Sequence, residues 1–431
     1  MRKTSVFKAF GPLFCAFILV AILLFSPLNK THRYTEKETD KFANLPQSIE
    51  VFTSDNIKHQ ALENKKYLPI MGSSELFKFD SFHPSVLAAK YQRDYAPFLI
   101  GFNGAHSLAH YFYMDGLKNE LNHRKLIFIF SPQWFKTKKS KQGEISLHGG
   151  MVSSAFKRYV TTKDLYHYIK SADPSDITTK FMAKRLLKFS LIKGDFLLRK
   201  NLTLLAHGKK LDMSLKAINS LQYNFLEAED ALFQKLFLPV SFVNIKDLEK
   251  KLPNKYDQKK LDHLAYKLGK KQSKSNPYGI NDFFFKYEVG KGFKKMKNAQ
   301  IKTNFLHGME YNDLQLLLNL FAKNHNDVLF VIPPVNGKWM KYTGLRQSMM
   351  KKFSKKIKYQ LNSQGFNNVV DFVGCNNEPY FMYDTIHIGK RGWLALDQKI
   401  TKFMKKANAP ENYQINNQEF LSKGWLEVDN H

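Results

Sequence analysis

Five short apolar runs, each ending at a glycine or proline, constrain the fold of this chain more than any other feature. They are YLPIMG (67–72), PFLIGF (97–102), KLIFIFSP (125–132), DVLFVIPP (327–334) and NVVDFVG (368–374). Continuous apolar runs of about 4–8 residues between turn residues are typical of strands that are buried on both faces. We therefore expect these runs to be the strands of a central parallel sheet.

Helical patterns separate these strand-like runs. Three of them directly precede a run: SFHPSVLAAKYQRD (81–94), SLAHYFYMDGLKNEL (107–121) and YNDLQLLLNLFAKNH (311–325). Strands that alternate with helices predict an α/β fold with a doubly wound sheet. Between about 150 and 300 the strand-like runs stop, and helical segments with Lys-rich loops take their place. This stretch is predicted to be a mostly helical insertion within the α/β domain.

The segment from Ala9 to Asn29 contains no charged residue. A bilayer core is spanned by about 20 apolar residues, whereas the apolar core of a signal peptide has only about 7–15. We predict a retained transmembrane anchor at 9–29, preceded by a cytoplasmic N-terminus at 1–8; the alternative is a cleaved signal peptide. Basic residues flank both ends, so their count does not give the orientation, but long domains translocate largely regardless of charge.

The expected order of the remaining parts follows from these patterns. A stalk or leading helix at 30–60 precedes the α/β domain at 61–407, which contains the insertion at about 150–300. Residues 408–431 are polar and are expected to form a loosely packed C-terminal tail.

The charge balance and the cysteines narrow the functional classes. The 67 Lys and Arg outnumber the 37 Asp and Glu, which gives a net charge of +30. Such a charge indicates a polyanionic neighbour, which on composition alone is nucleic acid, an anionic membrane or an anionic polymer. Cys15 lies in the apolar segment, so Cys375 is alone in the rest of the chain. A disulfide in the soluble part is not expected, and a cysteine-based zinc site is excluded.

Polar residues and glycines follow the predicted strands, at the sheet edge where open α/β sheets bind their ligands. The first run leads into Gly72-Ser73-Ser74-Glu75, where the glycine permits a sharp turn and the next helix offers N–H groups to an oxyanion. The second leads into GFNGAHS (101–107), whose glycines allow the backbone to approach a reacting centre. On its own, the first block is a common turn, and the second is as compatible with a tight strand-to-helix turn as with a site.

The third run is followed by SPQWF (131–135), in which the side-chain amide of Gln133 could donate to an oxyanion. A later segment, YDTIHIGKRGW (383–393), contains a D-x-x-H motif formed by Asp384 and His387. This spacing lets the carboxylate orient the imidazole, as a base that activates a serine hydroxyl requires. The alternative is an ordinary exposed histidine before a helix.

A G-x-S block, a glycine block, an amide donor and a late D-x-x-H motif form the layout of SGNH hydrolases. The N-terminal anchor with PIMGSSEL, SPQWF and DTIHIGKRGW closely resembles the DltD family of D-alanine transfer proteins from Gram-positive bacteria. The resemblance covers essentially the whole chain, including NPYGINDFF (276–284). It implies an SGNH/flavodoxin-like three-layer sandwich with a central parallel sheet.

The resemblance also implies roles for individual residues. Ser74 would be the nucleophile, His387 the general base and Asp384 the acid that orients it, while Ser73 would have a structural role. The oxyanion would be bound by the backbone N–H of Ser74 and by the glycine block near Gly104.

The resemblance also bears on Gln133 and on whether the reaction needs a cofactor. Gln133 stands where SGNH enzymes usually have asparagine, so its part in binding the oxyanion stays open. The family's reaction needs neither a metal nor another cofactor.

For function, the resemblance implies D-alanylation of teichoic acids, chiefly lipoteichoic acid, by an extracellular domain anchored to the cell membrane. The implied partners are lipoteichoic acid, the membrane and other D-alanylation proteins, among them a membrane O-acyltransferase, with D-alanyl carrier protein as a further candidate and no nucleic acid. Two alternatives remain: a thioesterase or esterase that acts on D-alanyl carrier protein or D-alanyl esters, and a non-catalytic scaffold that recruits carrier protein or polymer.

Overall fold

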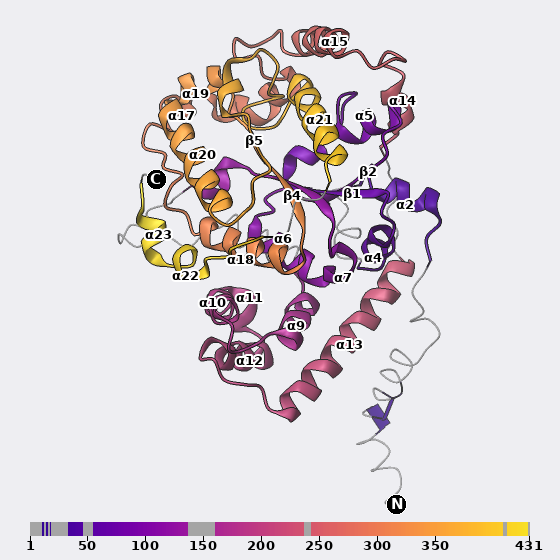
Figure 1. Cartoon of the computed structure of the whole chain (residues 1–431), viewed down its shortest axis with the longest axis vertical. Coiled ribbons are helices and arrows are strands. Elements are labelled where there is room, and N and C mark those ends of the chain that lie inside the picture. The colour runs from indigo at the N-terminus through magenta and orange to yellow at the C-terminus, as the bar shows by residue number, and fades with distance from the viewer. Residues whose placement is uncertain are drawn as a thin grey trace, which may run out of the picture. The chain divides into compact units, whose positions relative to one another are not determined.

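The computed structural model describes residues 33–45, 55–136, 160–236, 243–407 and 412–429, and isolated positions between 11 and 18 (Figure 1). The described residues fall into two compact units. The first takes those within Met1–Thr39, Ser48–Gln60 and Lys157–Ser241, and the second takes those within Asp40–Gln47, Ala61–Phe156 and Phe242–His431. Two helices precede the first strand: α2 (Glu36–Phe42) and α4 (Asp55–Glu63).

The second unit is built on a five-stranded sheet in the order β2-β1-β3-β4-β5. All neighbouring strands pair in parallel. The strands are β1 (Tyr67–Gly72), β2 (Ala96–Gly101), β3 (Lys125–Ile129), β4 (Asp327–Ile332) and β5 (Val369–Asp371). Four strands lie within the predicted apolar runs, and β2 begins one residue before its run, so the prediction of an α/β fold with a central parallel sheet is confirmed.

The helices of the second unit connect and cover these strands. They are α5 (Pro84–Lys90), α6 (Ser107–Gly116), α7 (Lys118–Leu121), α14 (Ile245–Glu249), α15 (Gln258–Lys271), α16 (Asp282–Phe284), α17 (Phe293–Met296), α18 (Glu310–Lys323), α19 (Gly337–Thr343), α20 (Gln347–Asn362), α21 (Lys390–Lys405), α22 (Asn417–Phe420) and α23 (Lys423–Glu427). Short 3₁₀ turns include η2 (Ser74–Phe77), η3 (Pro132–Phe135), η5 (Gly290–Gly292) and η6 (Val373–Asn377), and η4 (Phe285–Val289) is a π-helical turn.

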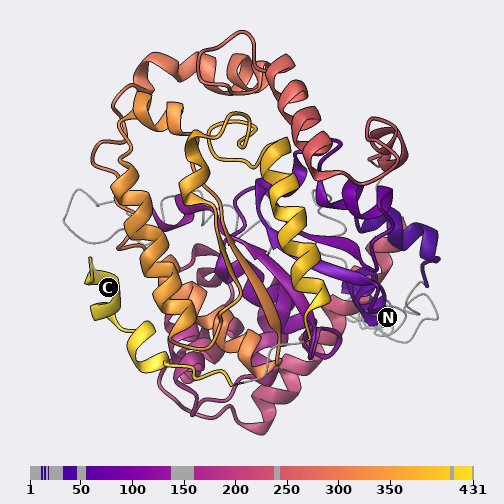
Figure 2. The same ribbon diagram turned by 45° about the horizontal axis from the view of Figure 1, so that its top comes forward.

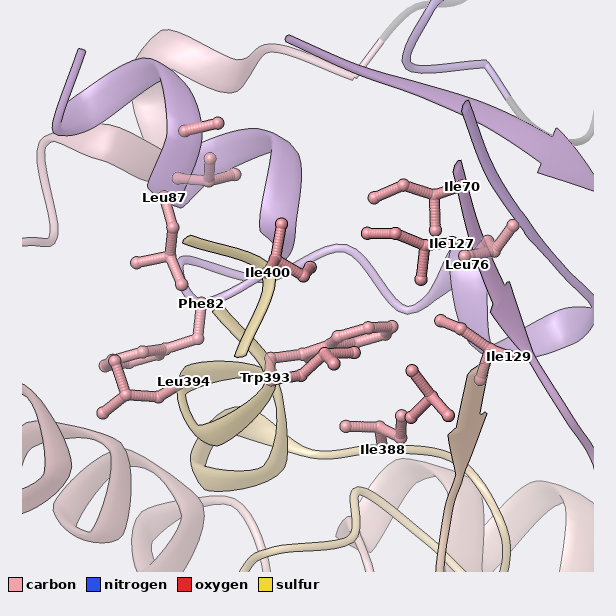
Figure 3. Close-up of a cluster of buried hydrophobic side chains, with 14 of the residues drawn as sticks. Ile70, Leu76, Phe82, Leu87, Ile127, Ile129, Ile388, Trp393, Leu394 and Ile400 are labelled. Carbon is pink, nitrogen blue, oxygen red and sulfur yellow. The ribbon is translucent and has the colours of Figure 1, made fainter. Parts of the chain in front are cut away.

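Both faces of the sheet are buried, which explains the continuous apolar runs. Successive side chains of a strand point to opposite faces. Ile127 and Ile129 of β3 join the hydrophobic cluster that contains Trp393 of α21 (Figure 3), and α21 crosses this face of the sheet in Figure 2. Between them in sequence, Phe128 points to the other face, where its ring lies 6.2 Å from that of Phe321 in α18.

The strand order also locates the edge where a site is expected. The chain passes from β1 to β2 on one side and then crosses to β3 on the other side of β1. In open α/β sheets, ligands bind beyond the carboxyl ends of the strands at such a reversal of strand order. The chain leaves β1 through Ser73 and Ser74, so these serines lie at that edge.

The first unit contains the helices α9 (Thr162–Ser171), α10 (Ile177–Leu186), α11 (Ser190–Lys193), α12 (Phe196–Ala206) and α13 (Met213–Leu236). A capping box begins α9, where the Thr161 side chain accepts from the backbone N–H of Asp164 and the Asp164 carboxylate accepts from that of Thr161. Between β3 and β4 the described residues contain helices and no strand. The later helices of this stretch, α14 to α17, belong to the second unit.

The C-terminal residues 412–429 are well packed, so the expectation of a loose tail is wrong for them. Phe420 and Trp425 are buried, and their rings lie 4.8 Å apart. The ammonium of the buried Lys356 in α20 donates to the carbonyls of Trp425 (2.7 Å) and Val428 (2.8 Å). The segment is polar overall, which led to the wrong expectation. Its few aromatic side chains are buried and pack it against the rest of the unit.

The predicted anchor at 9–29 lies largely outside the described residues. Among the helices that the structure does describe, none combines the length and the apolar character needed to cross a bilayer.

Candidate active site

Three residues predicted from the sequence meet at the carboxyl edge of the sheet. Ser74 Oγ lies 2.6 Å from His387 Nε2, although 313 positions separate the two residues. On the other side of the imidazole ring, His387 Nδ1 lies 2.6 Å from Asp384 Oδ2. Asp384 and His387 are buried, whereas Ser74 is partly exposed. Both distances are those of strong hydrogen bonds, so a serine, an imidazole and a carboxylate form one connected chain.

The D-x-x-H spacing explains how Asp384 orients the ring. Its Oδ1 accepts the backbone N–H groups of Ile386 (2.9 Å) and His387 (3.0 Å), which closes a tight turn. Its Oδ2 is then directed at His387 Nδ1. Because an ionised carboxylate can only accept, Nδ1 carries the proton and donates it. His387 Nε2 is therefore left to accept the hydroxyl proton of Ser74.

Backbone hydrogen bonds from distant segments hold this turn in place. The N–H of Tyr383 donates to the carbonyl of His387 (2.8 Å), and the Tyr383 carbonyl accepts from Asn281 (2.9 Å), just before α16. The carbonyl of Thr385 accepts from Asn336 (3.0 Å), at the start of α19. These contacts fix the position of His387 relative to the sheet rather than leaving it on a free loop.

Ser73 joins the end of β1 to the loop after β2. Its hydroxyl donates to the carbonyl of Phe102 (3.1 Å) and accepts the N–H of Gly104 (3.1 Å). Gly104 has a φ of +82°, a conformation that favours glycine. The contacts of Ser73 are thus with the backbone of the neighbouring loop, while those of Ser74 are with the imidazole.

Glu75 is the main residue of this edge whose role was missed from the sequence. It is 5% exposed, and its Oε1 accepts the N–H of Ser73 at 2.5 Å. Burial raises the pKa of Glu75 to about 6, and the backbone hydrogen bonds and the proximity of His387 counteract this only in part. Leu76, next in the chain, enters the hydrophobic cluster of Figure 3. The turn that carries Ser74 is therefore held by the buried carboxylate of Glu75 and by the side chain of Leu76 in the hydrophobic core.

Two glycines allow the strand ends to approach this turn. Gly72 and Gly101 are paired in register at the ends of β1 and β2. A Cβ on Gly101 would lie 2.4 Å from the carbonyl oxygen of Gly72. That carbonyl also lies 2.9 Å from Nε2 of the buried His110, whose pKa burial lowers to about 3. A neutral His110 that donates to this carbonyl was not predicted, since nothing in the pattern of α6 distinguishes it from a core residue.

Of the backbone N–H groups predicted to bind the oxyanion, only that of Ser74 is available to a ligand as the described side chains stand. Among the described residues, the N–H of Ser74 has no hydrogen-bond acceptor, so it can donate to a bound group. The N–H of Gly104 donates to Ser73 Oγ. Gln133 is exposed in η3, and its side chain makes no hydrogen bond to any described residue. Its neighbour Trp134 is buried and stacks on His106 with ring centroids 5.4 Å apart. The structure thus does not bring Gln133 into contact with Ser74, His387 or Asp384.

The fold and this geometry define a class: an α/β protein with a serine, a histidine and an aspartate connected at the carboxyl edge of a parallel sheet. Comparison with known proteins then gives the family. A family model described as DltD protein matches residues 44–405. The chain belongs to the DltD family, as its sequence motifs predicted.

Relatives in three organisms agree with this assignment. The chain is 38% identical to Protein DltD of Lacticaseibacillus rhamnosus over 422 residues, which is 97% of this chain and 96% of the relative. It is 30% identical to Protein DltD of Bacillus subtilis (strain 168), with 92% and 97% covered. For Protein DltD of Staphylococcus aureus (strain NCTC 8325 / PS 47) the identity is 26%, with 94% and 98% covered.

Proposed function

We propose that this protein transfers D-alanyl groups to lipoteichoic acid through an ester intermediate on Ser74. The observation that carries the proposal is the 2.6 Å contact between Ser74 Oγ and His387 Nε2. A serine hydroxyl is a weak nucleophile until a neighbouring base accepts its proton. Membership in the DltD family, whose name stands for D-alanine transfer, supports the choice of the acyl group.

In the first half of the reaction, Ser74 Oγ attacks the carbonyl carbon of a D-alanyl ester or thioester. His387 Nε2 accepts the hydroxyl proton, and Asp384 stabilises the imidazolium that forms. The tetrahedral intermediate collapses when the bond to the leaving group breaks, and the leaving group takes the proton from His387. The product is D-alanyl-Ser74.

In the second half, a glycerol hydroxyl of the polymer attacks D-alanyl-Ser74. His387 accepts the proton of that hydroxyl and returns it to Ser74 Oγ as the ester bond to the serine breaks. The unpaired N–H of Ser74 stabilises the oxyanion in both halves. A change in the χ1 rotamer of Ser73 would move its oxygen away and release the N–H of Gly104 as a second donor.

The fold belongs, in this proposal, to the SGNH hydrolase type, as a three-layer α/β/α sandwich. The order β2-β1-β3-β4-β5 is that of flavodoxin-like sheets. The candidate nucleophile lies two residues after the end of β1, and the Asp384–His387 turn ends three residues before α21 begins. This arrangement supports the type because it places both chemical groups at one edge.

We also propose that the domain faces the outside of the cell membrane, held there by the segment 9–29. The net charge of +30 supports a polyanionic acceptor beside an anionic membrane. Proposed partners are lipoteichoic acid, a membrane O-acyltransferase and D-alanyl carrier protein. Protease digestion of intact protoplasts tests the orientation, since an external domain is cleaved while cytoplasmic proteins stay intact.

Replacing Ser74 with alanine tests the proposed chemistry. Removal of a serine nucleophile costs about 10⁴–10⁶-fold in kcat, so the D-alanyl ester content of lipoteichoic acid in cells carrying only Ser74→Ala should fall to the level of a deletion strain. Ser363→Ala is the matched control, because Ser363 is exposed at the end of α20. Normal ester content in a folded, membrane-bound Ser74→Ala protein would instead favour a scaffold without chemistry.

A further inference from the structure

Lys78 lies beside the candidate active site and has not entered the chemistry described above. It is the first residue after η2, four positions beyond Ser74, and is partly exposed. Its Nζ lies 5.5 Å from the ring centroid of Phe284 and 5.6 Å from that of Tyr383. An ammonium at this distance from an aromatic ring is attracted to its face, so two rings hold the end of this flexible side chain.

One of these rings packs against His387, and the other packs against the first ring. The ring of Phe284 meets the imidazole edge to face, with centroids 6.2 Å apart. Tyr383 directly precedes Asp384, and its ring lies 6.4 Å from that of Phe284. The Lys78 ammonium is therefore held by two aromatic rings, one of which contacts the imidazole of His387.

The carboxylates of this region are engaged elsewhere. Asp384 is bonded to His387, and Glu75 accepts the N–H of Ser73. Asp80, two residues after Lys78, is 3.1 Å from the ammonium of Lys390. Lys78 itself forms no ion pair within the described part of the chain. Within the described part of the chain, the Lys78 ammonium thus has no ion-pair partner, and it lies on a phenylalanine ring that packs against His387.

We propose that Lys78 binds a phosphodiester of the acceptor polymer, next to the glycerol hydroxyl that attacks the acyl-enzyme. This inference rests on the proposed function, and it assigns to Lys78 the recognition of the polymer that accepts the D-alanyl group. A lysine ammonium binds phosphate as a point charge. The D-alanyl group carries an ammonium of its own and would be repelled by Lys78, so this cation suits the polymer and not the acyl group.

Binding of synthetic polyglycerol phosphate to the full-length protein in detergent micelles tests the inference directly. The loss of one partly exposed ion pair predicts that Lys78→Gln raises Kd about fivefold at low salt. The variant should also bind with a weaker dependence on salt concentration, because one fewer ionic contact is formed. Lys78→Arg keeps the charge and should stay within about twofold of the wild type.

The matched control is Lys259→Gln, which removes an exposed lysine of α15 from the same positively charged protein. Its Kd should equal that of the wild type. A Kd for Lys78→Gln that equals that of Lys259→Gln would overturn the inference. An unchanged Kd with a lowered kcat would also overturn it, since Lys78 would then act on the reacting acyl group instead of the polymer.

The binding measurement separates this inference from the proposed function. Repeating it in Ser74→Ala protein removes the chemistry and retains the proposed polymer site, so the effect of Lys78→Gln on Kd should persist. If Ser74→Ala leaves D-alanylation intact in cells, the proposed reaction fails whatever the Kd. If Ser74→Ala abolishes it and Lys78→Gln leaves Kd unchanged, the reaction stands and only the role of Lys78 fails.

Discussion

The carboxylate of Glu75 occupies the space that a side chain at Gly72 would need. A Cβ on Gly72 would lie 2.3 Å from Glu75 Oε1, well inside van der Waals contact. The same oxygen accepts the N–H of Ser73. Glycine is needed at the last residue of β1 because the buried carboxylate of Glu75 packs against it while bonding to the turn that carries Ser74.

Gly72→Ala should displace this carboxylate and the turn above it. Overpacking at a buried position costs about 1–3 kcal/mol, and because Ser74 shifts with the turn, the rate of ester hydrolysis should fall as well. Urea unfolding and hydrolysis of p-nitrophenyl acetate measure the two effects. Gly374→Ala is the control, because a Cβ there has no atom within 4 Å. Equal stability of the two variants would contradict a clash between a Cβ at Gly72 and the Glu75 carboxylate.

Glu75→Gln should change the pH dependence of stability. Burial raises the pKa of Glu75 from 4.5 to about 6, so between these values the folded state binds more protons than the unfolded state. The stability of the wild type therefore falls as the pH rises through this window, by about 2 kcal/mol from this group. Glutamine does not titrate, so the difference in unfolding free energy between the two proteins should shift by about this amount between pH 4 and 7. A constant difference from pH 4 to 7 would contradict the assignment.

Asp384→Asn tests the orientation of the imidazole. Asparagine retains an oxygen that accepts the N–H groups of Ile386 and His387, so the turn should persist. The amide cannot stabilise an imidazolium, and its NH₂ favours the wrong ring tautomer, which predicts a loss of about 10³–10⁴-fold in kcat. Kinetics on p-nitrophenyl acetate measure this loss, with circular dichroism to verify the fold. Asp247→Asn, at an exposed ion pair of α14, should retain wild-type kcat.

The strands could be predicted because their signal is local. A strand buried on both faces is apolar at most positions, and turn residues mark its ends, so each of β1 to β5 matches a predicted run to within one residue at its start. The meeting of Ser74 with His387 depends instead on contacts across 313 positions, and only the resemblance to a family connected them in advance.

Buried polar residues were the hardest to foresee. The side chain of Glu75 looks like a surface carboxylate in sequence, and its burial becomes visible only once Gly72 and the N–H of Ser73 surround it. The packing of Trp425 was missed for a similar reason, because its partners in α18 and α20 lie far back in the chain. Propensity and periodicity describe neighbours in sequence, whereas these contacts arise from tertiary packing.

The distance in sequence between Ser74 and His387 has a consequence for the order in which a growing chain acquires reactivity. Ser74 is synthesised 313 positions before the imidazole that would accept its proton. β5 and the turn at Asp384 are also completed late, after the whole of β1 to β4. A nascent or prematurely terminated chain that lacks these last segments would carry the serine without its base. Under the proposed mechanism, such a fragment would lack the group that activates Ser74 and should not transfer acyl groups.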